Sequence, residues 1–292
     1  MKKKVIVFGG SGFLGSNVSD FLTKKNYDVT IFDKEESKYL KSGQKMIIGD
    51  INDIDLVNKS IKGNKVVYNF AAISDIDECR SKPIETIKYN ILRNAEILES
   101  AIKNNVERFL FASSAYVYSS AGSFYKISKQ ASEQLIESFT LNEKTNYTIL
   151  RYGSLYGDRS DGKNSLYRLL SQAISDNKMD YYGDGNETRE FIHVKDAAEL
   201  SVKAISKEYE NQILMLTGSK SIKYIDLLEM ISEIMNSKIK IEIHPNKSKE
   251  HYKMSPYSFN PKMAKKLTLN PHIDLGQGLL NLISDIYEKD NL

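Results

Sequence analysis

VIVFGGSGFLG, from Val5 to Gly15, joins a short β-branched run to glycines at three-residue intervals. A helical spacing of apolar residues follows it. This order of strand, glycine turn and helix is typical of a dinucleotide-binding βα unit. In such a unit Gly9 allows the tight turn, Gly12 lets a pyrophosphate approach the backbone, and Gly15 lets the helix pack on the strand. The N–H groups that begin the helix would then face the phosphates.

Short apolar segments alternate with helical spacings through the first half of the chain. The segments that predict strands are β-branched or aromatic and occur at residues 5–8, 29–32, 46–48, 66–70, 109–112 and 148–150. Strands that are buried on both faces of a parallel sheet have this composition. The sequence therefore predicts an α/β fold, a Rossmann-type doubly wound parallel sheet.

The pattern loosens after Arg151, where polar turns separate shorter segments. We expect residues 1–155 to form the dinucleotide-binding domain, with return segments near 190–217. Residues 156–292 are expected to form a smaller C-terminal α/β substrate-binding lobe that is interleaved with the sheet. Helical spacings at 263–267 and 279–287 predict two helices near the end of the sequence.

Composition excludes several classes of protein. The 292 residues are 41% hydrophobic and 27% charged, which is incompatible with a disordered chain. The formal net charge is only +3, so no nucleic-acid partner is expected. No apolar run reaches the roughly 18 residues of a membrane span, so no membrane association is expected. The single cysteine, Cys79, cannot form an internal disulfide, which favours the cytoplasm and argues against a cysteine-rich metal site. No metal is expected.

Asp33 ends the second predicted strand and suits one kind of cofactor. A carboxylate at this position accepts hydrogen bonds from an adenosine ribose and repels a 2′-phosphate, which favours NAD over NADP. Lys34 follows directly, and we interpret it as a solvated turn lysine beside the cofactor.

The spacing of the three glycines resembles the short-chain dehydrogenase/reductase superfamily. Later segments resemble its extended branch, the NAD-dependent epimerase/dehydratase family. GDI at 49–51 is similar to the family's adenine-contacting segment, and NFAA at 69–72 to the segment that passes beside the cofactor. The resemblance implies NAD as the cofactor. The residues that would bind it are Gly9, Gly12, Phe13, Leu14, Gly15, Asp33, Lys34, Asp50, Ile51, Phe70, Ala71, Ala72, Tyr125, Lys129 and Tyr152.

Tyr125 and Lys129 are four residues apart, which places both on one face of a helix. A free tyrosine has a pKa of about 10, and a nearby ammonium lowers that pKa by stabilising the phenolate. Tyr125 could then take a hydroxyl proton as hydride leaves the adjacent carbon. SSAYVY at 113–118 is similar to a family motif whose hydroxyl residue orients the substrate oxygen. This resemblance assigns that role to Ser114, with Ser113 as the alternative.

Two later segments resemble family motifs that contact the substrate. RYGSLYG at 151–157 places Ser154 where the family has an asparagine. GDGNETREFIHVKD at 183–196 places Arg189 where the family binds the diphosphate of a nucleotide-sugar, and the planar guanidinium suits a phosphate. Ser114, Ser154 and Arg189 are thus the predicted substrate-binding residues. We interpret His193 as structural.

The chain also departs from the family pattern. The loop at 115–124 is short, which leaves the shape of the sugar pocket open. Ala115 and Tyr116 stand where the family's 4,6-dehydratases carry an Asp-Glu pair that moves protons during loss of water. This substitution makes a dehydratase less favoured. The resemblance continues in segments 257–261 and 275–279.

These features predict an NAD-dependent enzyme that oxidises a ring hydroxyl of a nucleotide-sugar, at C4, or reduces the corresponding ketone. A nucleotide-sugar epimerase is preferred; a 4-dehydrogenase or ketoreductase would use the same residues. A non-catalytic NAD-binding regulatory protein is the alternative from another class. The resemblance also implies a homodimer or homotetramer formed through helices at 87–103 and 128–139. An apolar stripe of Ala131, Leu135 and Phe139 fits that interface, and burial inside one subunit would explain it equally well.

Overall fold

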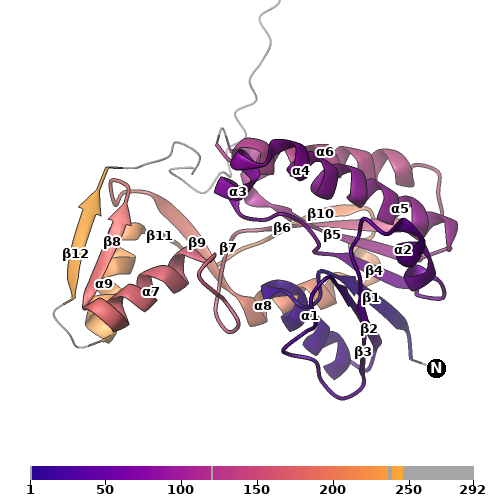
Figure 1. Cartoon of the computed structure of the whole chain (residues 1–292), viewed down its shortest axis with the longest axis horizontal. Helices are drawn as coiled ribbons and strands as arrows, with labels where there is room; N and C mark the ends of the chain where they lie inside the picture. The colour runs from indigo at the N-terminus through magenta and orange to yellow at the C-terminus, as the bar shows by residue number, and fades with distance from the viewer. Residues whose placement is uncertain (1, 120, 236–238, 246–292) are drawn as a thin grey trace, which may run out of the picture. The chain divides into compact units, whose positions relative to one another are not determined.

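A seven-stranded parallel sheet forms the centre of the fold (Figure 1). The computed structural model describes residues 2–119, 121–235 and 239–245. The strand order is β10-β6-β5-β4-β1-β2-β3, and every neighbouring pair is parallel. The strands are β1 (Lys4–Phe8), β2 (Asp28–Asp33), β3 (Gln44–Ile48), β4 (Val66–Asn69), β5 (Arg108–Ser114), β6 (Asn146–Tyr152) and β10 (Gln212–Leu216). This confirms the predicted doubly wound α/β fold.

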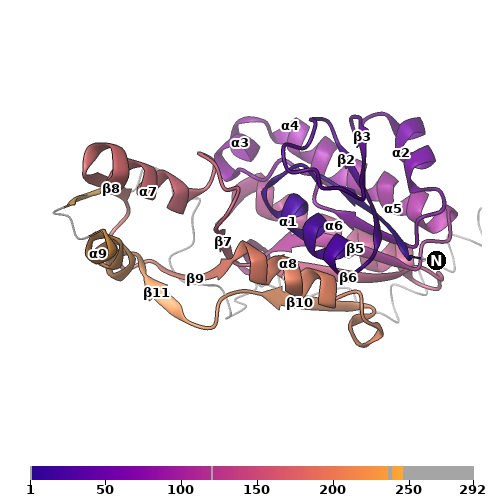
Figure 2. The same ribbon diagram turned by 90° about the horizontal axis from the view of Figure 1, so that it is seen from below.

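Both faces of the sheet are buried, as the unbroken apolar strands predict. In β1 the side chains of Val5 and Val7 enter one core, and those of Ile6 and Phe8 enter the other. Figures 1 and 2 show α1 and α8 on the first face and α2, α5 and α6 on the second. The helices around this sheet are α1 (Phe13–Lys24), α2 (Ile54–Ile61), α3 (Ile76–Ser81), α4 (Pro83–Thr86), a π-helix (Ile87–Leu92), α5 (Arg93–Lys103), a 3-10 turn (Ala115–Tyr118), α6 (Ser123–Thr140), α8 (Val194–Lys203) and a 3-10 turn (Lys207–Tyr209).

The order of the strands reverses at β1, which lies between β4 and β2. Ligands of open α/β sheets bind outside the carboxyl ends of the strands at such a reversal. The glycine turn follows β1, and residues 70–72 follow β4, so both lie at this point. Ser114 ends β5, the next strand along.

The lobe after β6 has its own small sheets and core. A three-stranded sheet has the order β11-β9-β7, and a two-stranded sheet pairs β12 with β8. Residues such as Leu169, Met179 and Leu228 form its apolar core. Its elements are β7 (Ser154–Tyr156), α7 (Ser165–Asp176), β8 (Lys178–Tyr182), β9 (Thr188–His193), β11 (Ser221–Lys223), α9 (Tyr224–Ile234) and β12 (Lys240–His244).

Several sequence predictions fall on other parts of the chain. The helices expected at 263–267 and 279–287, and the family-like segments 257–261 and 275–279, lie outside the described residues. Within the described residues, none of the helices has the length and apolar character needed to cross a membrane.

Candidate active site

The glycine turn after β1 is built so that side chains cannot be added at two of its three positions. Gly9 has a φ of +73°, and a Cβ there would lie 2.7 Å from the main-chain nitrogen of Ala71. A Cβ on Gly15 would lie 2.2 Å from the carbonyl oxygen of Gly9. At Gly12 the closest atom to an added Cβ is the same oxygen, at 3.4 Å. An added Cβ at Gly12 would therefore make only an ordinary contact, so this side of the turn is open.

The first turn of α1 has no side-chain cap. Gly12 occupies the N-cap position, and no side chain among the described residues accepts a hydrogen bond there. The N–H groups of a helix's first turn have no partners within the helix, and they carry its positive dipole end. The predicted cofactor residues Phe13 and Leu14 supply main-chain groups of this turn, which suits an anionic ligand.

Asp33 is held beside this turn by the main chain. Its carboxylate accepts a hydrogen bond from the N–H of Ser11 at 2.9 Å and one from the N–H of Glu35 at 3.3 Å. The Ser11 hydroxyl donates in turn to the carbonyl of Glu35 at 2.8 Å. Asp33 is partly exposed and Lys34 is exposed. The structure thus brings Asp33 to the mouth of the glycine turn.

The segments after β3 and β4 lie along the same edge of the sheet. Asp50 accepts hydrogen bonds from the main chain and side chain of Asn52, while Ile51 is buried. Phe70 continues the pairing with β1 by donating its N–H to the carbonyl of Phe8 at 2.9 Å. Ala71 and Ala72 follow Phe70 directly, and the approach of Gly9 to Ala71 shows that this segment touches the glycine turn.

Tyr125 and Lys129 lie on the first turns of α6, as the spacing predicts. The Lys129 ammonium is 5.7 Å from the centroid of the Tyr125 ring and 4.8 Å from that of Phe111. It donates to the carbonyl oxygen of Ala112, in β5, at 2.7 Å. Lys129 is only 4% exposed. Burial lowers the pKa of Lys129 to about 8, while the nearby Cys79 and Glu133 act in the opposite direction.

The structure distinguishes the two serines at the end of β5. The Ser113 hydroxyl is 2.5 Å from a carboxylate oxygen of Glu133 and donates to it. The Ser114 oxygen accepts a hydrogen bond from the N–H of Tyr116 at 3.2 Å, which leaves its proton for another acceptor. This geometry favours Ser114 over Ser113 as the residue that meets a substrate oxygen.

The predicted residues after β6 have different surroundings. Tyr152 is buried, and its hydroxyl lies 2.6 Å from that of Ser201, so its side chain belongs to the core. Burial raises the pKa of Tyr152 well above its usual value. Ser154 begins β7 and is half-buried. Arg189, in β9, is 6% exposed, and its guanidinium lies 5.6 Å from the centroid of the Tyr224 ring.

His193 has a structural position at the start of α8. Its ring nitrogen Nδ1 accepts a hydrogen bond from the N–H of Lys195 at 3.3 Å and thereby caps the helix. Its ring packs edge-on against Tyr156, with centroids 5.2 Å apart.

The model of the NAD dependent epimerase/dehydratase family matches residues 5–214. The chain belongs to this family. The identification confirms the resemblance of the sequence motifs, and with it an enzyme whose cofactor is NAD.

Relatives within the family catalyse more than one reaction. The chain is 28% identical to the UDP-N-acetyl-alpha-D-glucosaminuronate decarboxylase of Bacillus cytotoxicus, over 100% of both chains. It is 26% identical to the UDP-glucose 4-epimerase of Lactobacillus helveticus, over 84% of this chain and 85% of the relative. Among solved structures, the UDP-N-acetylglucosamine 4-epimerase of Methanobrevibacter ruminantium, in complex with UDP-N-acetylmuramic acid, superposes with a TM-score of 0.80. That enzyme is 26% identical, and the match covers 89% of this chain and 90% of that one.

The residues present fit the family's cofactor. The open side of Gly12 and the uncapped start of α1 suit a pyrophosphate, and Asp33 stands where an adenosine ribose would lie. Lys129 and Tyr125 lie on α6, and Lys129 donates to Ala112 near the carboxyl end of β5 in the same sheet.

We expect Asp33→Asn to weaken NAD binding roughly 10- to 100-fold, because a hydrogen bond to a charged group contributes about 1.5–3 kcal/mol. The substitution should also reduce the preference for NAD over NADP, since it removes the negative charge that repels a 2′-phosphate. Calorimetric titration with both cofactors measures this. Asp28→Asn on the same strand is the matched control, because Asp28 pairs with Lys45 instead. Equal NAD affinity in Asp33→Asn and the wild type would contradict the assignment.

Sequence reasoning missed a group of polar residues that surrounds the predicted catalytic ones. Asn90, in the π-helix, donates from Nδ2 to the Ser128 hydroxyl at 3.0 Å and to the carbonyl of Ile73 at 2.9 Å. Glu133 binds Arg151 as well as Ser113. One signal in the sequence could have pointed to Glu133: it follows Lys129 by four residues, so both lie on the same face of a helix.

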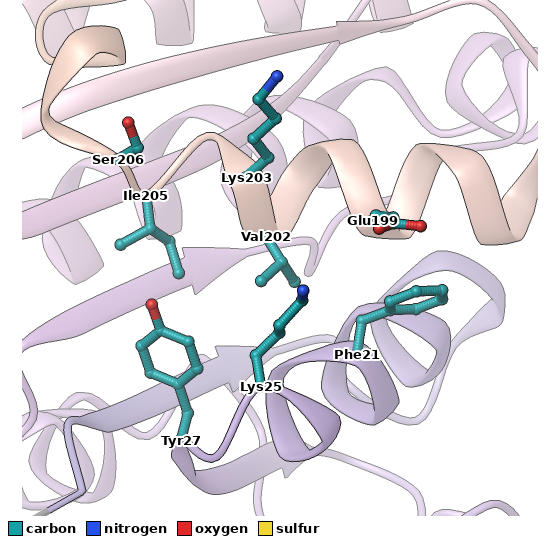
Figure 3. A pocket seen from close by; sticks show the side chains of 8 residues that line it. All are labelled: Phe21, Lys25, Tyr27, Glu199, Val202, Lys203, Ile205 and Ser206. Carbon is teal, nitrogen blue, oxygen red and sulfur yellow. The ribbon is translucent and has the colours of Figure 1, made fainter.

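The pocket drawn in Figure 3 lies elsewhere. It has a volume of about 560 Å³ and lies between the carboxyl-terminal ends of α1 and α8. None of the residues predicted to bind cofactor or substrate lines it. The lining residues are Phe21, Lys25, Tyr27, Glu199, Val202, Lys203, Ile205 and Ser206.

One group of side chains has the composition of a metal site. Asp180, Glu242 and His244 place ligand-type atoms within 4.8 Å of one another on β8 and β12. The Lys178 ammonium already lies 3.0 Å from Asp180 and 2.8 Å from Glu242. A cation is thus balancing both carboxylates, and we assign no metal to this group.

Proposed function

We propose that this protein is a nucleotide-sugar 4-epimerase. It would oxidise the C4 hydroxyl of a nucleotide-linked sugar and then reduce the ketone from its other face. The observation that carries the proposal is the grouping of Tyr125, Lys129 and Ser114 at the sheet edge that holds the glycine turn. The similarity to UDP-sugar 4-epimerases supports it.

The proton chemistry follows from these side chains. NAD, when bound, supplies the acceptor for a hydride. Ser114 directs its hydroxyl proton to the substrate oxygen and so orients it. Tyr125 accepts the hydroxyl proton as the C–H bond breaks and returns it when the ketone is reduced. The Lys129 ammonium, facing the Tyr125 ring, stabilises the negative charge that this transfer leaves on the phenolate oxygen.

Arg189 and Ser154 are the proposed contacts to the nucleotide-sugar. Both belong to the small sheet of β7, β9 and β11, and Ser154 pairs with Phe191 two residues beyond Arg189. The buried Arg189 guanidinium donates to the carbonyl of Thr188 at 2.9 Å, and its planar array of N–H groups suits the oxygens of a diphosphate. The Arg189 guanidinium also lies over the Tyr224 ring, and this contact helps to fix the orientation of the arginine side chain.

A decarboxylase is the second candidate, because the relative matched over its whole length has that activity. Both reactions begin with oxidation at C4. If the sugar carries a carboxylate at C6, the C4 ketone makes it a β-keto acid, which loses carbon dioxide.

A 4-dehydrogenase or ketoreductase would stop after one hydride transfer. A dehydratase is disfavoured because Ala115 and Tyr116, in the 3-10 turn after β5, have no carboxyl group to act as an acid or a base. The Tyr116 ring instead packs edge-on against Tyr125.

Mass spectrometry of a mixed pool of UDP-, GDP-, CDP- and dTDP-sugars and sugar acids, incubated with the purified protein, tests these assignments. A new species of unchanged mass is expected and means epimerisation. A product lighter by carbon dioxide would mean the decarboxylase, and one lighter by two hydrogens a dehydrogenase. No change in any sugar, with NAD supplied, would contradict the proposal.

A homodimer is proposed from the exposed face of α6. Ile127 and Phe139 are 50% and 39% exposed, and with Ala131 and Leu135 they form a stripe at four-residue steps. Light scattering should give twice the chain mass, and Ile127→Glu should give the monomer. Leu141→Glu, which alters an apolar side chain exposed just beyond the helix, is the control. A monomeric wild type would contradict the dimer.

The location proposed for the enzyme is the cytoplasm. Cys79 is buried and has no disulfide partner, which fits a compartment that keeps thiols reduced.

A further inference from the structure

A buried ion pair joins Glu133, on the helix of the proposed catalytic residues, to Arg151 on β6. Arg151 donates from Nε to one carboxylate oxygen of Glu133 at 2.9 Å and from Nη2 to the other at 2.5 Å. The two side chains are only 13% and 8% exposed. This two-point contact is the strongest form of the arginine–carboxylate pair.

Two more residues complete the group. Ser113 donates its hydroxyl proton to Glu133 at 2.5 Å. The Arg151 guanidinium also donates to the hydroxyl of Tyr118 and lies 4.5 Å from the centroid of that ring. The group therefore joins four segments: β5, the 3-10 turn after it, α6 and β6.

This placement relates the ion pair to the reaction. Glu133 is one helical turn beyond Lys129, which itself is one turn beyond Tyr125. Ser113 immediately precedes Ser114 in β5. A hydrogen bond between Ser113 and Glu133 therefore fixes the distance between the helix that carries the lysine and the strand that carries the oxygen-orienting serine.

Stability alone is a weak reason for such a pair. Removing two charges from water costs several kcal/mol per ion, so well-packed apolar residues of similar volume often serve a fold equally well. A carboxylate near an ammonium has an additional effect, since it favours the charged form of the lysine.

We propose that Glu133 and Arg151 are positioning residues for Tyr125 and Lys129 in this reaction. The inference rests on the proposed function. Arg151 orients the carboxylate, Ser113 links it to β5, and Glu133 lies one helical turn beyond the lysine on α6.

The groups that face Lys129 come from three elements. Tyr125 and Glu133 lie on α6 itself, Cys79 lies on α3, and β5 contributes the Ala112 carbonyl and the Phe111 ring. Cys79 and Glu133 both raise the pKa of Lys129, and burial raises the pKa of the Cys79 thiol itself. Glu133 is the carboxylate among these groups that opposes loss of the lysine proton.

Three variants separate the effect on the position of the catalytic residues from the effect on the charge of Lys129. They are Glu133→Gln, Arg151→Met and the double variant. The titration of Lys129 is followed by NMR of lysine-labelled protein, with Lys129→Arg identifying the resonance. Glu133→Gln should lower the pKa of Lys129 by about one unit, because the anion is lost. Arg151→Met should leave it unchanged or raise it, because the carboxylate remains. Each single variant should lower kcat at least tenfold while KM changes less than threefold.

The outcomes distinguish this inference from the proposed function. An unchanged Lys129 titration and kcat in Glu133→Gln would overturn the positioning role. If Glu133→Gln does not fold, the double variant, which leaves no lone buried charge, should show the same lowered pKa, and an unshifted titration there would also overturn it. If the wild type turns over no nucleotide-sugar, the proposed function fails, and the NMR titration still decides whether Glu133 controls Lys129.

Discussion

Tyr125→Phe is expected to lower turnover about 10²- to 10⁴-fold, the usual loss when a positioned acid–base group is removed. The variant keeps the ring, which is half-buried and packs edge-on against Tyr116 with centroids 6.2 Å apart. The fold and the affinity for NAD should therefore change little. Turnover is measured as product formed from the nucleotide-sugar found in the mixed-pool assay.

Tyr167→Phe is the matched control for this result. It removes a hydroxyl from an exposed tyrosine on α7 and should retain full activity. Wild-type turnover in Tyr125→Phe would show that the proton leaves by another route and would remove the basis of the proposed mechanism.

Lys129→Met is expected to abolish most activity while making the ligand-free protein more stable at pH 7. Activity should fall about 10²-fold or more, because the phenolate loses the charge that stabilises it. The gain in stability follows from the cost of burying an ammonium. Burial lowers the pKa of Lys129 from 10.5 to about 8, and that difference corresponds to about 3 kcal/mol. Loss of the hydrogen bond to Ala112 offsets part of this, which leaves a gain of about 1–2 kcal/mol.

The sign of the pH dependence follows from the same shift. Between pH 8 and 10.5 the unfolded chain still holds the lysine proton and the folded chain has lost it, so wild-type stability should rise with pH across this interval. Lys129→Met should lack that rise. Urea unfolding of both proteins at several pH values measures it. A variant that is less stable than the wild type at pH 7 would contradict the account.

The parts of the site that lie close together in sequence were predictable. The glycine turn occupies seven residues, and the observed φ of Gly9 and the crowding at Gly15 are the reasons that glycine is required. Tyr125 and Lys129 are one helical turn apart, so helical periodicity alone places them together. The strands of the sheet were predictable because burial on both faces leaves a continuous apolar run.

Contacts between distant segments were not predictable. Glu133 and Arg151 meet only because α6 packs on a sheet in which β6 follows β5, and nothing local in either segment requires it. The direction of Tyr152 is a similar case. Both faces of β6 are buried, so the sequence does not reveal that this hydroxyl enters the core toward Ser201. Short elements such as α3 and α4 are too brief to produce a helical pattern.

The most direct test of the central claim uses a nucleotide-sugar deuterated at C4, chosen from the substrates that the mixed-pool assay identifies. The account predicts an epimer that keeps the deuterium, because the hydrogen leaves C4 as hydride and returns from the same bound NAD without meeting water. Loss of the deuterium to solvent would mean that a proton leaves the carbon instead, and that would contradict oxidation at C4 by Tyr125 and NAD.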